Sequence, residues 1–257
     1  MSAAPLARRN PTVKLALVFV ISLAVMFVLD PITAAVLYLL ALGGVALGTR
    51  APARDLVLAH VPFLAFALGV LVVNVLSRPG EVLWQAGVLR VTVEGLSVGA
   101  ALAARTLVVG VLAVGFLLST DGVALVHSLR QNARLSPRVA YAVLAGYRLL
   151  QDMPKEWAVI QHAHAVRAPW RGGRPPRGPR HLGRVVFTLL VVTVRRGERM
   201  AQALESRGLG LSPRTSWRPV RVTPADWLLA AGVLVVLAAV LAGSAALGVL
   251  RGPGALG

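Results

Sequence analysis

Long stretches of apolar residues constrain the fold of this chain more than any other feature. A helix needs about 17–25 mostly apolar residues to cross the hydrocarbon core of a bilayer. Hydrophobic residues make up 56% of the 257 residues, which is more than one soluble core buries. We therefore predict an all-α fold, a polytopic helical membrane protein. About five spans are expected, at Thr12–Leu29, Ile32–Gly48, Leu56–Leu76, Val93–Leu118 and Trp227–Leu250.

Residues at the ends of these stretches indicate where helices begin. Asp30 and Pro31 predict a turn followed by a helix, because proline is favoured at the first helical position. Pro224 and Asp226 are the corresponding start signals of the last span. Lys14, near the start of the first span, is expected to extend its ammonium group to the membrane interface.

The fourth stretch carries two features of its own and follows a polar segment at Ser77–Thr92. Gly95 and Gly99 form a G-x-x-x-G pair, which lets a neighbouring helix approach closely. Arg105 is an intramembrane candidate for function, because an arginine inside a span is costly and is usually retained for a role. The alternative is that Arg105 pairs with a backbone carbonyl or a carboxylate and only fixes the packing.

Positive charge is concentrated between Thr120 and Thr223. This interval holds 18 of the 27 Lys and Arg residues but only 5 of the 10 Asp and Glu residues. Such an excess is retained in the cytoplasm, and the short loop with Arg50 and Arg54 selects the same side, so the N-terminus is expected to be cytoplasmic. Three regions follow: an N-terminal membrane bundle of about four spans at 1–119, a basic cytosolic module at 120–223, and a final membrane helix with a short tail at 224–257. Within the module, helices are predicted at Gly122–Ala133, Pro137–Leu150, Lys155–Ala168 and Gly183–Arg207.

Two segments of the basic module share a pattern at an offset of forty residues. In the second segment Ala203 and Arg207 lie four residues apart, hence on one helix face, and Gly208 is suited to end the helix. Both arginines of the pattern are thus expected at helix tips, beside small residues that let another surface come close. A cation in the last helical turn also favours the helix dipole, so simple capping is the alternative. The corresponding positions of the first segment hold Ala163, Arg167 and Ala168.

These segments resemble a known family. A-L-E-S-R-G at Ala203–Gly208 and A-V-R-A at Ala165–Ala168 look like the two Ala-Arg-Gly-type motifs in the transmembrane T component of energy-coupling-factor (ECF) importers. The first motif departs from the family pattern, because Ala168 stands where glycine is commonest. The resemblance covers nearly the whole chain and includes N-P-T-V-K-L at Asn10–Leu15, Asp30-Pro31, and L-L-S-T-D at Leu117–Asp121.

The resemblance implies the membrane scaffold subunit of an ATP-driven importer of a vitamin or a transition-metal ion. The cytosolic module is then a helical coupling module whose two long helices cross and dock on two ATP-binding-cassette (ABC) ATPase subunits. A separate small membrane protein binds the substrate, and membrane lipid is a further partner, contacted by the basic loop Arg171–Arg180. The ATPase-docking positions that the motifs imply are Ala163, Ala165, Arg167, Ala168, Ala203, Glu205, Arg207 and Gly208.

The sequence shows no catalytic or cofactor site. All ten carboxylates lie at or beyond the edges of the predicted spans, which disfavours an ion-coupled carrier and intramembrane acid–base chemistry. A Walker A motif is absent, so ATP use is expected to belong to partners. There is no cysteine, and His162 and His164 point about 200° apart on a helix, so no metal site is predicted. Nucleic acid is not expected as a partner, because the cations are spread over helix ends and a loop.

Two alternatives to the scaffold stay open. A permease subunit of an ordinary ABC importer also docks on ATPases, but usually through one coupling loop per subunit. A stand-alone integral membrane enzyme requires a catalytic set that is not visible here. A scaffold requires two docking helices and no catalysis of its own. The transported substrate is not predicted, because in the resembling family another subunit selects it.

Overall fold

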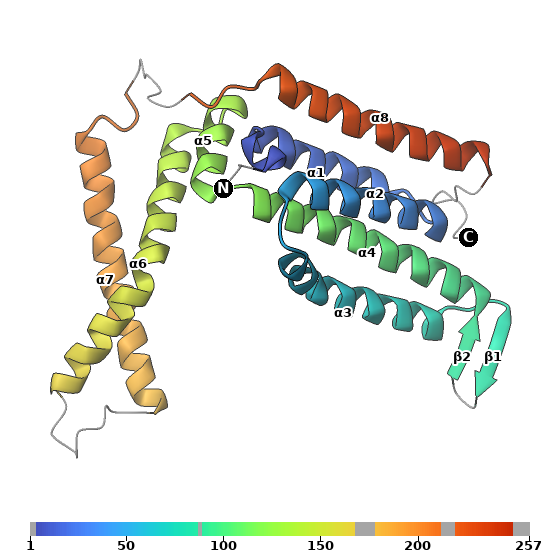
Figure 1. The fold of residues 1–257 in the computed structure, drawn as a ribbon. Coiled ribbons are helices and arrows are strands. Elements are labelled where there is room, and N and C mark those ends of the chain that lie inside the picture. The colour runs from blue at the N-terminus through green and yellow to red at the C-terminus, as the bar shows by residue number, and fades with distance from the viewer. Residues whose placement is uncertain (1–3, 87–88, 168–177, 212–218, 249–257) are drawn as a thin grey trace. The chain divides into compact units, whose positions relative to one another are not determined.

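The computed structural model describes residues 4–86, 89–167, 178–211 and 219–248. The chain divides into two compact units. We call Met1–Ser128 with Val220–Gly257 the membrane unit, and Leu129–Pro219 the crossed-helix unit. The described elements (Figure 1) are η1 (Pro5–Arg8), α1 (Pro11–Met26), α2 (Pro31–Thr49), α3 (Ala53–Ser77), β1 (Val82–Ala86), β2 (Leu89–Thr92), α4 (Val93–Ser119), α5 (Gly122–Asn132), α6 (Pro137–Arg167), α7 (Pro179–Ser206) and α8 (Pro224–Ala246).

Four helices in the described part of the membrane unit are long and apolar enough to cross a bilayer: α2, α3, α4 and α8. The predicted helical, multi-pass membrane fold is confirmed. The predicted first span is shorter than expected, because α1 ends at Met26 after 16 residues, about 24 Å of helix. The total number of crossings therefore stays a prediction.

Helix α4 packs against α1, α2 and α3, and its glycines allow a close approach. A Cβ atom at Gly95 would lie 2.8 Å from the carbonyl oxygen of Asn74, and one at Gly99 would lie 3.1 Å from that of Leu71. Both carbonyls belong to the backbone of α3, so a side chain at either position displaces that helix. The predicted role of the Gly95–Gly99 pair is confirmed.

The apolar core of the membrane unit consists of two clusters that share helices α2 and α4. Each contains fully buried valine from α4, which places this helix at the centre of the unit. The buried members are Val25, Leu37, Val108 and Leu237 in one cluster and Val45, Leu56 and Val111 in the other.

The predicted helix starts are also confirmed. The carboxylate of Asp30 accepts a hydrogen bond from the backbone N–H of Thr33 at 2.6 Å, and Pro31 occupies the first turn of α2. At the start of α8, the carboxylate of Asp226 accepts from the backbone N–H of Thr223 at 2.8 Å and from its hydroxyl at 2.7 Å. These bonds satisfy backbone donors that a helix start leaves unpaired.

Polar residues from distant parts of the sequence meet where α1 and α8 begin. The backbone N–H of Asn10 donates to Asp226 Oδ1 at 2.9 Å. The hydroxyl of Ser128, on α5, donates to Asn10 Oδ1 at 2.8 Å and lies 2.7 Å from the hydroxyl of Thr12. Asn10, Ser128 and Asp226 are all buried. We call Asn10, Thr12, Ser128 and Asp226 the polar knot, because their hydrogen bonds join α1, α5 and α8.

Lys14 does not extend into solvent, and the position of its ammonium group relative to the membrane interface stays a prediction. The Lys14 side chain is buried, and Nζ donates to the carbonyl oxygens of Leu6 at 3.1 Å and Ser119 at 2.7 Å and to Ser119 Oγ at 3.2 Å. A lysine ammonium group has three donors, so these acceptors satisfy it. The Leu6 acceptor lies in η1, and the position of η1 beside α1 is set by the tertiary structure.

The polar segment predicted at Ser77–Thr92 contains a hairpin. Strands β1 and β2 pair antiparallel, with Val82 opposite Thr92 and a bulge before Trp84. Thr92 then begins α4, since its hydroxyl accepts from the backbone N–H of Gly95 at 3.0 Å. The hairpin therefore leads directly into the central helix.

The crossed-helix unit has one long helix where the sequence predicts two. Helix α6 continues through Pro154, although this residue lacks the N–H that would bond the carbonyl of Leu150. Leu150 is exposed, so water can satisfy that carbonyl and the loss stays local. Helix α7 begins at Pro179 rather than at the predicted Gly183, with proline in its first turn.

Candidate functional site

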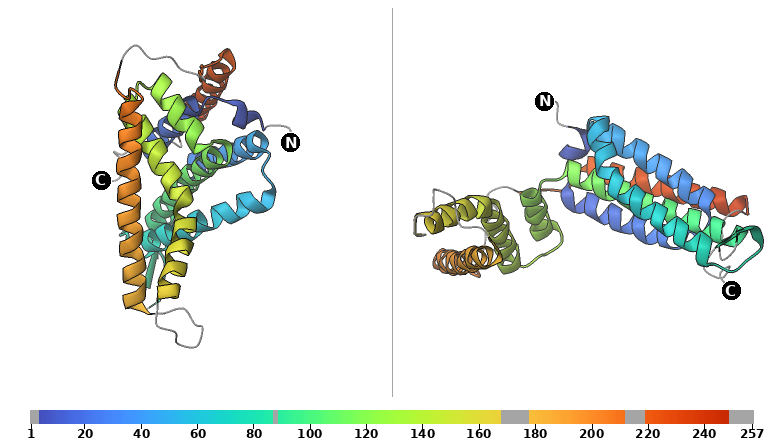
Figure 2. Two further views of the ribbon diagram at one scale, coloured as in Figure 1. Left: turned by 90° about the vertical axis from the view of Figure 1, so that its left-hand side faces the viewer. Right: turned by 90° about the horizontal axis from the view of Figure 1, so that it is seen from below.

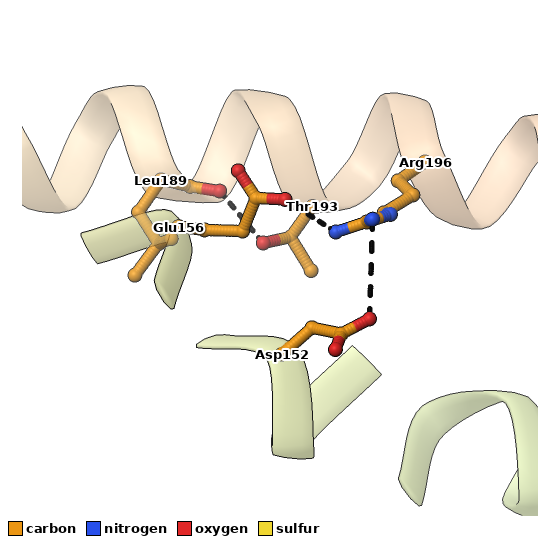
Figure 3. Close-up of polar contacts among 5 residues, drawn as sticks. All are labelled: Asp152, Glu156, Leu189, Thr193 and Arg196. Atoms are coloured by element: carbon orange, nitrogen blue, oxygen red, sulfur yellow. Dashed lines mark hydrogen bonds and ion pairs between the residues drawn. The ribbon is translucent and has the colours of Figure 1, made fainter. Parts of the chain in front are cut away.

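Helices α6 and α7 form an antiparallel pair that crosses (Figure 1), and the left view of Figure 2 shows them side by side from another direction. Within the described residues, one ion-pair cluster joins them (Figure 3). Arg196 of α7 donates to the carboxylate of Glu156 and lies 3.9 Å from that of Asp152. Asp152 and Glu156 are four residues apart on α6, hence on one face.

The two arginine motifs are equally far from this cluster. Arg167 lies eleven residues beyond Glu156, and Arg207 lies eleven residues beyond Arg196. Eleven residues correspond to about 16 Å of helix. Because the helices run in opposite directions, the two arginines mark opposite ends of the pair, at most about 33 Å apart. The Glu156–Arg196 pair was not predicted, although the forty-residue offset that aligns the motifs also aligns these two residues.

The second motif ends α7 in a defined geometry. Gly208 has a positive φ of 81°. Its N–H donates to the carbonyl of Glu205 at 2.9 Å, and the N–H of Leu209 donates to that of Leu204 at 3.0 Å. These two bonds make a Schellman motif, which glycine favours because a left-handed backbone is strained with a Cβ atom. The predicted role of Gly208 as the helix-ending residue is confirmed, and Arg207 is the C-cap.

The small and acidic residues of the second motif lie on the surface of the unit. Ala203 and Glu205 are exposed. The carbonyl of Ala203 accepts from the hydroxyl of Ser206 at 3.1 Å, which holds that serine close to the helix. Ala203 therefore offers a shallow patch one turn before Arg207.

The first motif lies at the end of α6. Arg167 is the last residue of this helix and is exposed, while Ala163 and Ala165 are partly exposed. Ala168 lies outside the described residues. The structure thus describes three of the four predicted positions in this motif.

Both motif arginines are exposed and unpaired within the described part of the chain. Neither guanidinium has a hydrogen-bond or ion-pair partner there. Arg196, by contrast, uses its guanidinium inside the pair. The two arginines at the tips are therefore available to carboxylates of another molecule.

Two histidines lie near the first tip. His164 of α6 and His181 of α7 have ring centroids 5.6 Å apart in an edge-to-face contact, and His164 Nε2 lies 3.4 Å from the hydroxyl of Thr188. His162 was weighed as a partner of His164 and His181 was not predicted, because the His164–His181 contact joins two helices. No group of three or more candidate metal ligands occurs among the residues that the structure describes.

Arg105 lies near the middle of α4 and is partly exposed. It has no hydrogen-bond or ion-pair partner among the described residues. The alternative was that Arg105 fixes the packing by pairing with a carbonyl or a carboxylate, and the described part of the chain contains no such partner. Its function stays a prediction.

Comparison with known proteins decides the family. Residues 2–217 match the CbiQ family, described as cobalt transport protein. The chain belongs to the CbiQ family. The motif resemblance agrees with the relatives of this chain. Two of them carry the name energy-coupling factor transporter transmembrane protein EcfT.

The first of these relatives, from Heliobacterium modesticaldum, is 25% identical over 238 residues, which cover 89% of each chain. The second, from Thermosediminibacter oceani, is 27% identical over 186 residues, covering 68% of this chain and 70% of the relative. The resemblance to the T component of ECF transporters is confirmed. This CbiQ-family chain is a multi-pass membrane component of an ECF-type transporter.

Proposed function

We propose that this chain is the scaffold subunit that passes the closing motion of two ATPase subunits to a separate, substrate-binding membrane subunit. The observation that carries the proposal is the pair of exposed, unpartnered arginines at opposite ends of α6 and α7, each eleven residues from one joining ion pair. Such an arrangement offers two similar contacts to two similar partners. Two contacts on one chain favour the scaffold over a permease with one coupling loop.

Docking through arginine fits the chemistry of both tips. A guanidinium binds a carboxylate through two parallel hydrogen bonds, and the small residues Ala163 and Ala203 leave room for a partner surface. The end of α7 is held in place by the Schellman motif at Gly208, so Arg207 is presented from a fixed backbone. Glu205, Ala165 and Ala168 complete the proposed docking set.

ATP hydrolysis in this proposal belongs to the partners. The chain has no Walker A sequence and therefore lacks the phosphate cradle of P-loop ATPases. The purified chain alone is expected to hydrolyse no ATP. Turnover by the isolated chain, unaffected when contaminating ATPases are removed, would move the protein to the enzyme class.

The cargo in this proposal is a vitamin or a transition-metal ion that another subunit binds. Comparing the proteins that co-purify with the chain in mild detergent tests this assignment. Two ATPases and one small hydrophobic protein are the expected set. A soluble, exported binding protein in place of the small membrane subunit would instead indicate an ordinary ABC importer.

The proposed orientation places the N-terminus and the crossed-helix unit in the cytoplasm. The basic residues favour this side. Reporters inserted at Ser136, between α5 and α6, and at Gly80, between α3 and β1, test it. Ser136 is expected to be cytoplasmic and Gly80 external, and the reverse result excludes docking on cytoplasmic ATPases.

Substitution of the tip arginines tests the central proposal. Truncation of an arginine that pairs with a partner's carboxylate costs about 2–5 kcal/mol, roughly thirty- to several-thousand-fold in affinity. Arg167→Ala and Arg207→Ala are each expected to weaken ATPase retention by that amount, and the double variant to abolish it. Lysine should rescue poorly, because its point charge does not reproduce the planar fork of arginine.

Arg195→Ala is the matched control. Arg195 is exposed on α7 and has no partner within the described residues, but it lies far from the helix end. The control should retain ATPases like the unmodified protein. Equal behaviour of Arg207→Ala and Arg195→Ala would reduce the tip arginines to helix caps.

A further inference from the structure

A cavity of about 400 Å³ lies within the membrane unit, between α1, α2, α4 and α8. Its walls are apolar except at Lys14 and Ser119. These two residues bond to each other, with Lys14 Nζ donating to the Ser119 carbonyl at 2.7 Å. The cavity therefore has no free polar group to bind a polar solute, and its lining suits an apolar occupant.

The cavity is elongated along the helices. Its lining extends from Lys14 to Ile21 on α1 and from Leu229 to Leu237 on α8, which is about 10–12 Å of helix. The core cluster that contains Leu37 and Leu237 closes one end. Leu6 of η1 lines the other end. A narrow, flexible hydrocarbon chain fits this shape.

The cavity also has an opening on the surface of the membrane unit. Gly44 of α2 and Gly232 of α8 both line it and are both exposed. A Cβ atom at either glycine would meet no atom within 4 Å. Of the residues of α8, Asp226 and Leu237 alone are buried, so this helix covers the cavity loosely and leaves a path from the bilayer.

Cations stand at the end lined by Leu6. Arg8 follows Leu6 in η1, and the side chain of Leu6 packs so closely on Gly48 that a Cβ atom there would lie 2.4 Å from it. This contact brings η1 to the end of α2, where Arg50 is the C-cap. Arg8 and Arg50 are exposed and have no hydrogen-bond or ion-pair partner within the described residues. No acidic residue lines the cavity.

We propose that this cavity holds one acyl chain of an anionic phospholipid, whose phosphate binds Arg8 and Arg50. The apolar walls select the hydrocarbon chain, and the two guanidinium groups at the Leu6 end select the negative headgroup. The inference depends on the membrane unit alone and not on ATPase docking. A failure of either proposal leaves the other intact.

The test measures lipid binding by the full-length chain in mild detergent, by native mass spectrometry. The delipidated protein is titrated with dioleoylphosphatidylglycerol and, separately, with dioleoylphosphatidylcholine. Gly44→Leu with Gly232→Leu fills the cavity and should lower phosphatidylglycerol binding at least tenfold. Gly43→Leu with Gly243→Leu is the matched control, because neither glycine lines the cavity and neither has an atom within 4 Å of its built Cβ.

The headgroup contact is tested by Arg8→Gln and Arg50→Gln. Each should weaken phosphatidylglycerol binding about fivefold and leave phosphatidylcholine binding unchanged. Unchanged binding in the filled variant overturns the proposal. The proposal is also overturned if the filled variant binds lipid normally but loses a co-purifying membrane protein. In that case the cavity receives a helix of a partner protein.

A measurement on the unmodified chain covers the case in which the filled variant does not fold. Phosphatidylglycerol with a photoreactive acyl chain is expected to label peptides that contain Leu37–Val45 or Leu229–Leu237. Labelling confined to other peptides overturns the proposal.

Discussion

In the membrane unit, α4 places glycine backbones against α3, two apolar clusters fill the bundle, and the polar knot joins α1, α5 and α8. In the described part of the crossed-helix unit, by contrast, Ala140, Ile160 and Val185 are the buried apolar residues, and the ion pairs of Arg196 are partly exposed. Burying an aliphatic side chain contributes about 1.5–3 kcal/mol, whereas ordering each residue costs about 1–2 kcal/mol.

The two units are therefore stabilised in different ways. The membrane unit carries its own core, whereas α6 and α7 bury too little apolar surface to fix their arrangement by themselves. Phe187 and Leu190 of α7, for example, are exposed. The arrangement of the crossed helices is thus expected to depend on contacts beyond the pair, which suits a part that transmits motion.

The largest effect is expected in the polar knot. Asp226→Ala removes the acceptor of two backbone N–H groups and one hydroxyl. The buried N–H of Asn10 is then unpaired, which costs about 1–3 kcal/mol, and the loss of the helix-start bonds at the exposed Thr223 costs about 0.5–2 kcal/mol more. We expect a loss of about 3 kcal/mol or more, measured as earlier thermal unfolding in detergent. Asp226→Asn keeps one acceptor and should lose less. Equal stability of Asp226→Ala and the unmodified chain would show that the polar knot does not stabilise the membrane unit.

The next effect tests the α3–α4 contact. Gly95→Ala places a methyl group 2.8 Å from the Asn74 carbonyl, so the helices must separate, at a cost of about 1–3 kcal/mol. Thermal unfolding measures it. Gly69→Ala is the control, because its Cβ meets no atom within 4 Å; it should be neutral or slightly stabilising. A neutral Gly95→Ala would show that this contact is loose.

A smaller effect is expected at the end of α7. Gly208→Ala forces an alanine into a left-handed conformation, which costs about 1–2 kcal/mol. Faster hydrogen exchange at Gly208 and Leu209 should report the loosened helix end, with global stability unchanged. Gly208→Asn is the control, since asparagine tolerates this conformation. A drop in global stability would mean that the crossed-helix unit has more cooperative structure than its buried residues indicate.

The smallest effect is expected at the joining ion pair. Arg196→Ala should lower stability by about 0.2–1 kcal/mol, because the pair is partly exposed and screened by solvent. A double-mutant cycle with Glu156→Gln measures the coupling in low and high salt. A coupling of several kcal/mol would show that the pair is buried in the functional state. The crossed-helix unit would then have a buried core contact, as the membrane unit does.

The sequence by itself determined the features that depend on neighbouring residues. Asp30-Pro31 and Pro224 with Asp226 start helices, and Gly208 ends one, because capping chemistry acts within a few residues. Apolar runs of spanning length determined the helical membrane class, since a helix satisfies its backbone groups within one segment and needs no water to do so. The residues of the two arginine motifs were likewise visible as a repeat at constant offset.

The tertiary structure alone decided the features that join distant residues. Lys14 is buried because η1 and α4 supply carbonyl groups to it, and no local pattern reveals those partners. Asp226 was predicted as a helix start, but its bond to the Asn10 backbone spans 216 residues. Two helices were expected at Pro137–Leu150 and Lys155–Ala168, yet α6 continues through Pro154, beside the exposed residue Leu150. The contacts of Arg196 and His181 also depend on how α6 and α7 cross, and long-range packing sets that crossing.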